Sequence, residues 1–127
     1  MTVSRKRKRR IDVDGRVFLW SIKEIKHDLH DLVASTGYSL NVVSEDGTFC
    51  VEYPLGQTED RRHVVVKGSG FRDAQRVGGP WRRFLCPPFG SQLTISPRDV
   101  AQLIRWATSD ADPQPVEVDY MGRPVVP

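Results

Sequence analysis

A run of six consecutive cations lies near the start of the chain: Arg5, Lys6, Arg7, Lys8, Arg9 and Arg10. The first ten residues contain no acid, so the run can neutralise several phosphates and release their counterions. It therefore predicts salt-sensitive, non-specific binding to nucleic acid or to another polyanion. The same composition is also typical of a nuclear-localisation patch, or of a solvated tail without a binding role.

A second group of cations is interleaved with aromatic residues in the middle of the chain. Its members lie in and next to a glycine-containing stretch: Arg72, Arg76, Trp81, Arg82, Arg83 and Phe84. Such a mixture is typical of single-strand nucleic-acid sites, and Arg and Trp are also frequent anchors of protein interfaces. The alternative is that the rings face the core and the arginines face solvent. In a strand over 81–85, however, each face would carry one arginine and one aromatic residue, which favours a binding role.

Other chemistry-bearing residues lack the spacing that a catalytic or metal site requires. His27 and Asp31 would share one side of a helix, but zinc needs three or four protein ligands and no matching cluster follows. The stretch 67–71 has the spacing of neither a phosphate-binding loop nor a nucleophile elbow. Cys50 and Cys86 lie in no context that stabilises a thiolate. The sequence assigns no catalytic, cofactor or metal residue, and favours a binding protein over a small enzyme of unrecognised type.

The formal net charge of +3 conceals an uneven distribution along the 127 residues. The first ten residues carry +6, so residues 11–127 sum to −3. Within that body the stretch 60–86 carries +5 and the remainder −8. A dedicated nucleic-acid binder usually has a basic face, so this distribution ranks a protein partner slightly above nucleic acid.

The elements that must position these residues begin with a predicted hairpin. Asp14-Gly15 separates the apolar runs 11–13 and 16–22, and such a dipeptide favours a two-residue type I′ turn. Alternation in the second strand places three large apolar residues on the face that we expect to pack on the core: Phe18, Trp20 and Ile22.

Further strands follow along the chain. Asp46-Gly47 predicts a second hairpin between the alternating runs 38–43 and 48–53. Three shorter β-type runs predict more strands, at 63–67, 81–86 and 116–120. Residues 23–35 have helical spacing, which favours a short helix, and the alternative is a long continuation of the preceding strand that ends in a loop.

The clearest helix is predicted over 97–109. Ser96 is placed as the N-cap, Pro97 occupies the first helical position, and Asp99 completes a capping box. The apolar stripe of this helix is Val100, Leu103, Ile104 and Ala107.

Together these elements predict an α+β fold. We expect an antiparallel β-sheet built from hairpins, with one face packed by the C-terminal helix at about 97–109. Residues 1–10 are predicted to be a disordered basic tail and 11–127 a single domain. No signal peptide or apolar span is visible, which predicts a cytoplasmic protein without a membrane partner, with both cysteine thiols free.

Two stretches resemble a family of small uncharacterised bacterial proteins. The stretch from Ile11 to Trp20 is similar to that family's V-D-G-x-x-F-x-W hairpin, and the stretch from Ile95 to Ala107 to its I-T-P-x-x-V helix, with Ser96 in place of Thr. The resemblance covers about a quarter of the chain. It implies a bacterial single-domain α+β protein and brings no catalytic residue.

The sequence therefore predicts a non-enzymatic binding protein that uses the basic, aromatic-containing segment, with Arg72, Arg76, Trp81, Arg82 and Arg83 as its binding residues. The alternative is a nucleic-acid-associated protein that binds phosphates through the basic tail. No cofactor is expected.

Overall fold

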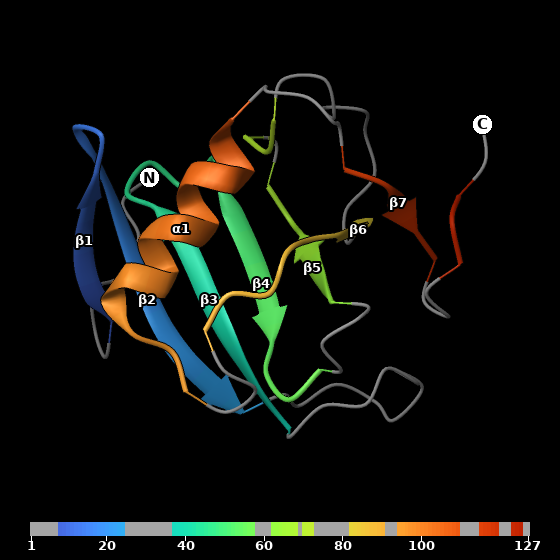
Figure 1. Ribbon diagram of the computed structural model, residues 1–127. Helices are drawn as coiled ribbons and strands as arrows, with labels where there is room; N and C mark the ends of the chain where they lie inside the picture. Colours follow the sequence, from blue (N-terminus) through green and yellow to red (C-terminus); the bar gives the residue numbers. More distant parts are fainter. Residues whose placement is uncertain are drawn as a thin grey trace.

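The computed structural model describes residues 8–24, 37–57, 62–68, 70–72, 82–90, 94–109, 115–119 and 123–125. These residues form one open antiparallel sheet and one helix, which confirms the predicted α+β class (Figure 1). The elements in chain order are β1 (Arg9–Val13), β2 (Arg16–Glu24), β3 (Tyr38–Ser44), β4 (Cys50–Pro54), β5 (His63–Val66), β6 (Arg82–Leu85), α1 (Pro97–Thr108) and β7 (Glu117–Val118). The order of the strands in the sheet equals their order in the chain, so each strand pairs with its sequence neighbours.

The first hairpin forms at the predicted turn. Val13 pairs with Arg16, which leaves Asp14 and Gly15 as the two turn residues, with φ of 52° and 83°. Positive φ at both positions defines the type I′ geometry, whose twist matches that of the flanking strands. Strand β1 begins at Arg9, within the stretch that was predicted to be a disordered tail. The cross-strand partner of Arg9 is Trp20, and this pairing extends the strand into the basic run.

The second predicted hairpin is confirmed, with a longer connection than a two-residue turn. Strands β3 and β4 pair from Ser39–Pro54 to Val43–Cys50. The Asp46 carboxylate closes the connection because it accepts hydrogen bonds from Ser44 Oγ (2.6 Å), Thr48 Oγ1 (2.8 Å) and the Thr48 N–H (3.0 Å). These bonds hold the pKa of Asp46 far below its ordinary value.

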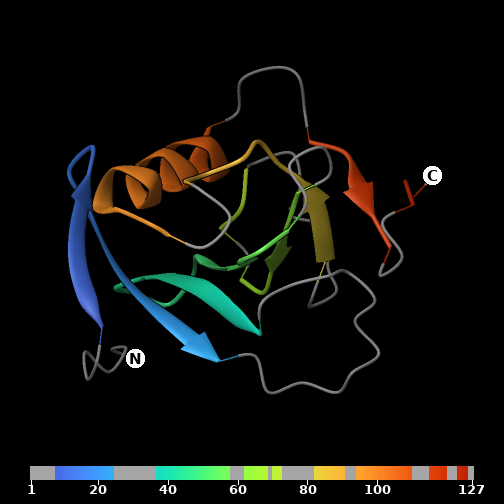
Figure 2. The same ribbon diagram turned by 60° about the horizontal axis from the view of Figure 1, so that its bottom comes forward.

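The helix begins and packs as predicted. Ser96 Oγ accepts a hydrogen bond from the Asp99 N–H, and the Asp99 side chain accepts one from the Ser96 N–H, so both halves of the capping box are present. The buried residues of α1 are the four predicted stripe residues, Val100, Leu103, Ile104 and Ala107. Figure 2 shows α1 lying across one face of the sheet, which we call the helix-covered face.

The core lies between that face and the helix. Phe18 and Trp20 belong to it as predicted, but the third residue of the set does not, since Ile22 is 44% exposed beyond the helix. Leu19, on the opposite face of β2, is buried as well. Alternation therefore assigned the side of each residue correctly, whereas coverage by other elements decides which residues are buried.

The remaining sequence predictions can be compared with the structure only where they fall on described residues. Strand β2 extends to Glu24, and the predicted helix or strand at 23–35 otherwise lies outside the described residues, as do Arg5, Lys6 and Arg7 of the tail. The two cysteines are free thiols, as expected. Burial raises the pKa of both thiols above the ordinary value.

Candidate functional site

Arg72, the first predicted binding residue, lies at the end of the helix and is 4% exposed. Its guanidinium donates a hydrogen bond to the Trp106 carbonyl (2.7 Å) and lies 5.6 Å from the centre of the Trp106 ring. Its backbone N–H donates to the Ala107 carbonyl (3.0 Å). Arg72 therefore satisfies carbonyls of the last helical turn, which have no partners within the helix, and its charge complements that end of the helix dipole.

Arg82 is engaged by an acid from the neighbouring strand. Its Nη2 and Nε atoms donate to the two carboxylate oxygens of Glu117, at 2.6 and 3.0 Å, and its guanidinium lies 5.3 Å from the centre of the Phe84 ring. The bidentate pair links β6 to β7. It raises the pKa of Arg82 and lowers that of Glu117.

The remaining members of the predicted segment are not brought to these two arginines. Arg83 pairs with Val65 and Val118, so it faces away from the helix-covered face that carries Arg82. Its buried Nε has no hydrogen-bond partner in the described structure. Arg76 and Trp81 lie outside the described residues. The segment thus stays a predicted site, with the described arginines spread over two faces and one helix end.

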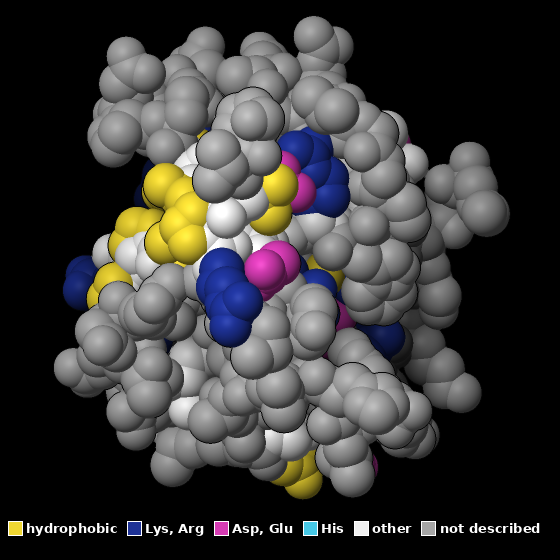
Figure 3. Space-filling view, turned by 90° about the vertical axis from the view of Figure 1, so that its right-hand side faces the viewer, with side chains coloured by type: hydrophobic (Ala, Val, Ile, Leu, Met, Phe, Trp, Pro, Cys, Tyr) yellow, Lys and Arg dark blue, Asp and Glu magenta, His cyan; other side chains and the backbone are white. Residues whose placement is uncertain are grey.

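The face around β7 is mixed in character. Figure 3 shows hydrophobic side chains beside basic and acidic ones there. Val116 and Val125 are 47% and 48% exposed. Beyond β7, Val118 bridges to Pro124, and hydrogen bonds join Asp119 to Arg123 and Val125 to Glu117. Residues 123–125 therefore occupy the outer edge of β7.

A cavity with a different arrangement lies at the start of β1. Arg9 is exposed, and its guanidinium lies 5.4 Å from the centre of the ring of its cross-strand partner Trp20. No acidic side chain within the described ranges forms an ion pair with Arg9. Its charge is therefore available to a ligand, whereas those of Arg72 and Arg82 already have partners.

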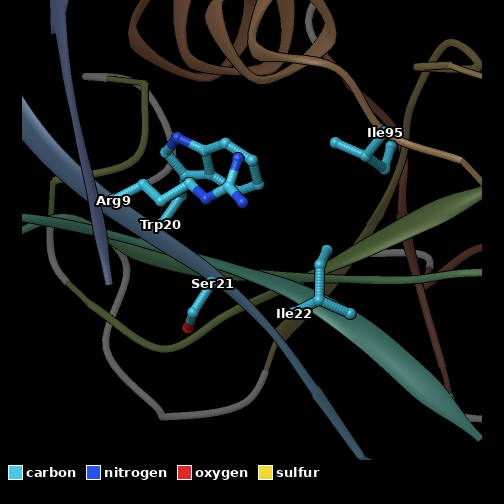
Figure 4. Close-up of a pocket in the computed structure, with 5 residues that line it drawn as sticks. All are labelled: Arg9, Trp20, Ser21, Ile22 and Ile95. Atoms are coloured by element: carbon cyan, nitrogen blue, oxygen red, sulfur yellow. The ribbon is translucent and has the colours of Figure 1, made fainter. Parts of the chain in front are cut away.

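The walls of this cavity combine polar and apolar surface in similar shares, and we call it the β1–β2 groove. Its volume is about 300 Å³, and it is lined by Arg9, Trp20, Ser21, Ile22 and Ile95. Figure 4 shows the Arg9 chain over the Trp20 ring, with Ile22 and Ile95 beyond them and the Ser21 hydroxyl pointing away. Arg9 is the one charged residue among the described lining. This volume lies at the lower limit for ligand pockets and suits one or two side chains better than a cofactor.

A half-exposed ring extends the apolar surface of the groove. Tyr38 pairs with Glu24, and Leu40 pairs with Ile22, so Tyr38 and Ile22 are diagonal neighbours on the helix-covered face. Tyr38 is 50% exposed. The groove therefore continues into exposed apolar surface on the side away from Arg9.

Sequence reasoning missed the groove because it assigned Arg9 to the tail. The signal was present, since counting back by two from the buried Val13 and the half-buried Ile11 places Arg9 on the same face of the strand. The contribution of Ile95 had no local signal, because this residue is distant from β2 in the chain and comes to it only through the packing of the segment that precedes α1.

Other chemical groups are scattered in the described part of the chain. No three His, Cys, Asp or Glu side chains gather there as a metal site would require. The buried Tyr53 hydroxyl accepts hydrogen bonds from Arg62 Nη1 (2.6 Å) and the Phe89 N–H (3.2 Å).

No helix among the described residues is long and apolar enough to cross a membrane.

Comparison with protein-family models, with curated proteins and with solved structures finds no match to this chain. The resemblance stated from the two sequence stretches therefore stays a prediction.

Proposed function

We propose that the protein is a non-enzymatic binding protein that takes an acidic segment of a partner protein in the β1–β2 groove. The observation that carries this proposal is the Arg9 guanidinium, which lies over Trp20 beside a partly apolar cavity and has no acidic partner in the described structure. The sequence predicted a binding site of cationic and aromatic residues in the segment 72–84. The groove has the same chemistry at a different place, with a cation that has no acidic partner in the described structure.

The lining defines the chemistry of the partner. A carboxylate can accept a charge-assisted hydrogen bond from Arg9, and an apolar side chain beside it would cover Ile22 and Ile95. The basic residues that precede Arg9 in the chain would attract further acids of the same segment over the screening length, about 8 Å at physiological salt. The preferred partner is therefore an acidic segment with one or two apolar residues.

The nucleic-acid alternative makes a different demand on the site. A base would need an exposed aromatic face beside the cation for stacking, but Trp20 is 6% exposed and Arg9 covers it, and the half-exposed Tyr38 lies on the side of the groove away from Arg9. Among the lining residues the exposed apolar contribution comes from Ile22, which suits an aliphatic side chain. These features favour a protein segment, and binding of phosphates by the basic tail becomes an outcome of the test.

The test compares three fluorescent probes of equal length by anisotropy. The first is a glutamate peptide with two central leucines, the second has serines in place of the leucines, and the third is an oligodeoxythymidine. We expect the first peptide to bind at least about tenfold more tightly than the second, because the leucines bury apolar surface in the groove. Equal binding of both peptides, or tighter binding of the oligonucleotide, would contradict the proposal.

Two neighbouring variants separate the groove from general electrostatics. Arg9→Gln removes the groove cation, whereas Arg10→Gln removes the same charge from the opposite face of β1. We expect Arg9→Gln to weaken binding of the leucine-containing peptide by about tenfold or more and Arg10→Gln by about twofold or less. Equal losses would assign the binding to the basic run as a whole.

A further inference from the structure

The outer edge of β1 is open in the described structure. Strand β1 is the terminal strand of the sheet, and no described element lies beyond it in Figures 1 and 2. At the other end of the sheet, residues 123–125 pair with β7. Of the two terminal strands, β1 is therefore the longer one, and it has no described neighbour on its outer side.

The turn determines which residues present these groups. In a two-residue hairpin the residues that flank the turn exchange backbone hydrogen bonds, and bonded and non-bonded pairs then alternate along the strands. Val13 flanks the turn, so Val13, Ile11 and Arg9 direct their backbone groups toward β2. Arg10 and Asp12 consequently direct theirs to the open edge.

The charges on this edge are complementary to themselves. Arg10 and Asp12 share one face of β1, their Nη2 and Oδ1 atoms lie 3.5 Å apart, and their side chains are 57% and 60% exposed. If a second copy of β1 lies antiparallel with Ile11 opposite Ile11, Arg10 of each copy faces Asp12 of the other. The same register brings Lys8 opposite Asp14. Opposite charges directly across a strand pair stabilise it, and each Arg10–Asp12 pair is also one that can exchange two backbone hydrogen bonds.

We propose that two copies of this chain associate by antiparallel pairing of their β1 strands about Ile11, which joins their sheets into one. The contact is two-fold symmetric and uses the same edge of both copies, so it closes at a dimer. The first residues of the two β1 strands lie at opposite ends of this antiparallel contact. Five-residue strands bury little area, and we therefore expect a weak dimer that dissociates on dilution and in high salt. Arg9 of the β1–β2 groove lies in the same strand but directs its backbone groups toward β2, and the peptide test of the groove and the sedimentation test of the edge have separate readouts.

The test is sedimentation velocity of four proteins over about a hundredfold range of concentration. The wild type should shift from monomer to dimer without larger species. Arg10→Asp places acids opposite acids, and Asp12→Arg places arginines opposite arginines, so each variant alone should raise the dimer dissociation constant by about tenfold or more. The doubly exchanged chain, Arg10→Asp with Asp12→Arg, should dimerise as the wild type does.

A mixture of the two single variants gives the sharpest result. The Arg10→Asp chain carries acids at both positions and the Asp12→Arg chain carries arginines at both, so every cross-strand pair between the two chains joins opposite charges. Equal amounts of two chains that do not self-associate should therefore form a mixed dimer.

Circular dichroism of each variant serves as the control that the substitutions at these exposed positions leave the fold intact. A wild type that remains monomeric at the highest concentration would overturn the proposal. A mixture that stays monomeric, or single variants that dimerise like the wild type, would overturn it too.

Discussion

Two arginines in this molecule make the same aromatic contact in opposite settings. Arg9 lies 5.4 Å from the Trp20 ring and Arg72 lies 5.6 Å from the Trp106 ring. Arg72 is buried and donates to a carbonyl at the end of the helix, whereas Arg9 is exposed beside a cavity. A cation over a ring therefore does not by itself indicate a binding site, because the guanidinium of Arg72 supports a helix end whereas that of Arg9 has no acidic partner among the described residues.

The largest expected effect separates these two arginines by stability. Arg72→Ala leaves the Trp106 carbonyl without its charged donor and removes a buried side chain, so we expect the free energy of unfolding to fall by about 3 kcal/mol. Arg9→Ala removes an exposed cation–ring contact and should cost less than about 1 kcal/mol. Urea denaturation of both variants measures the difference.

Equal losses in the two variants would break the distinction between a structural and an available arginine. A loss at Arg9 as large as that at Arg72 would show that the start of β1 supports the fold, and the groove would then be part of the framework. Peptide binding by the folded Arg72→Ala variant, measured below its unfolding transition, should be unchanged.

The elements were predictable because their signals are local. The Asp14-Gly15 turn and the Ser96–Asp99 capping box each lie within a few residues, and the backbone geometry that they favour is the one observed. The partners of the arginines were not predictable in this way. Arg72 and Trp106 are 34 positions apart in the chain, and Arg82 and Glu117 are 35 apart.

The exposed groove was harder to predict for a related reason. Alternation places Trp20 and Ile22 on one face of β2. It does not predict how much of that face the helix covers. Burial of Trp20 and exposure of Ile22 follow from the position of α1 and of Ile95, which the sequence pattern does not contain. The composition of a basic run likewise conceals that its last two residues belong to a strand.

A second prediction concerns the buried cation Arg62. In Tyr53→Phe the Arg62 guanidinium and the Phe89 N–H lose their common acceptor in the interior, so we expect the free energy of unfolding to fall by about 2 kcal/mol. Tyr38→Phe makes the same chemical change at a half-exposed position and should cost less than about 0.5 kcal/mol. If chemical denaturation gives equal values for the two variants, the Tyr53 hydroxyl does not serve as that acceptor.

The smallest expected effect concerns the Arg82–Glu117 pair and its dependence on pH. Arg82 lowers the pKa of the Glu117 carboxyl below its ordinary value of 4.5, which is also the value in the unfolded chain. A depressed folded pKa contributes stability that is fully present above pH 4.5 and is lost as the pH falls through the folded pKa. The side chains are 17% and 26% exposed, so solvent weakens the pair and the contribution should be about 1 kcal/mol.

Glu117→Gln tests this sign directly because glutamine cannot titrate. At pH 7 the variant should be less stable than the wild type by about 1 kcal/mol, and the two should converge as the medium is acidified below pH 4.5. Chemical denaturation at a series of pH values measures the gap. A gap that persists at low pH would mean that Glu117 contributes through packing of β7 on β6, and Arg82 would then resemble Arg9 more closely than Arg72.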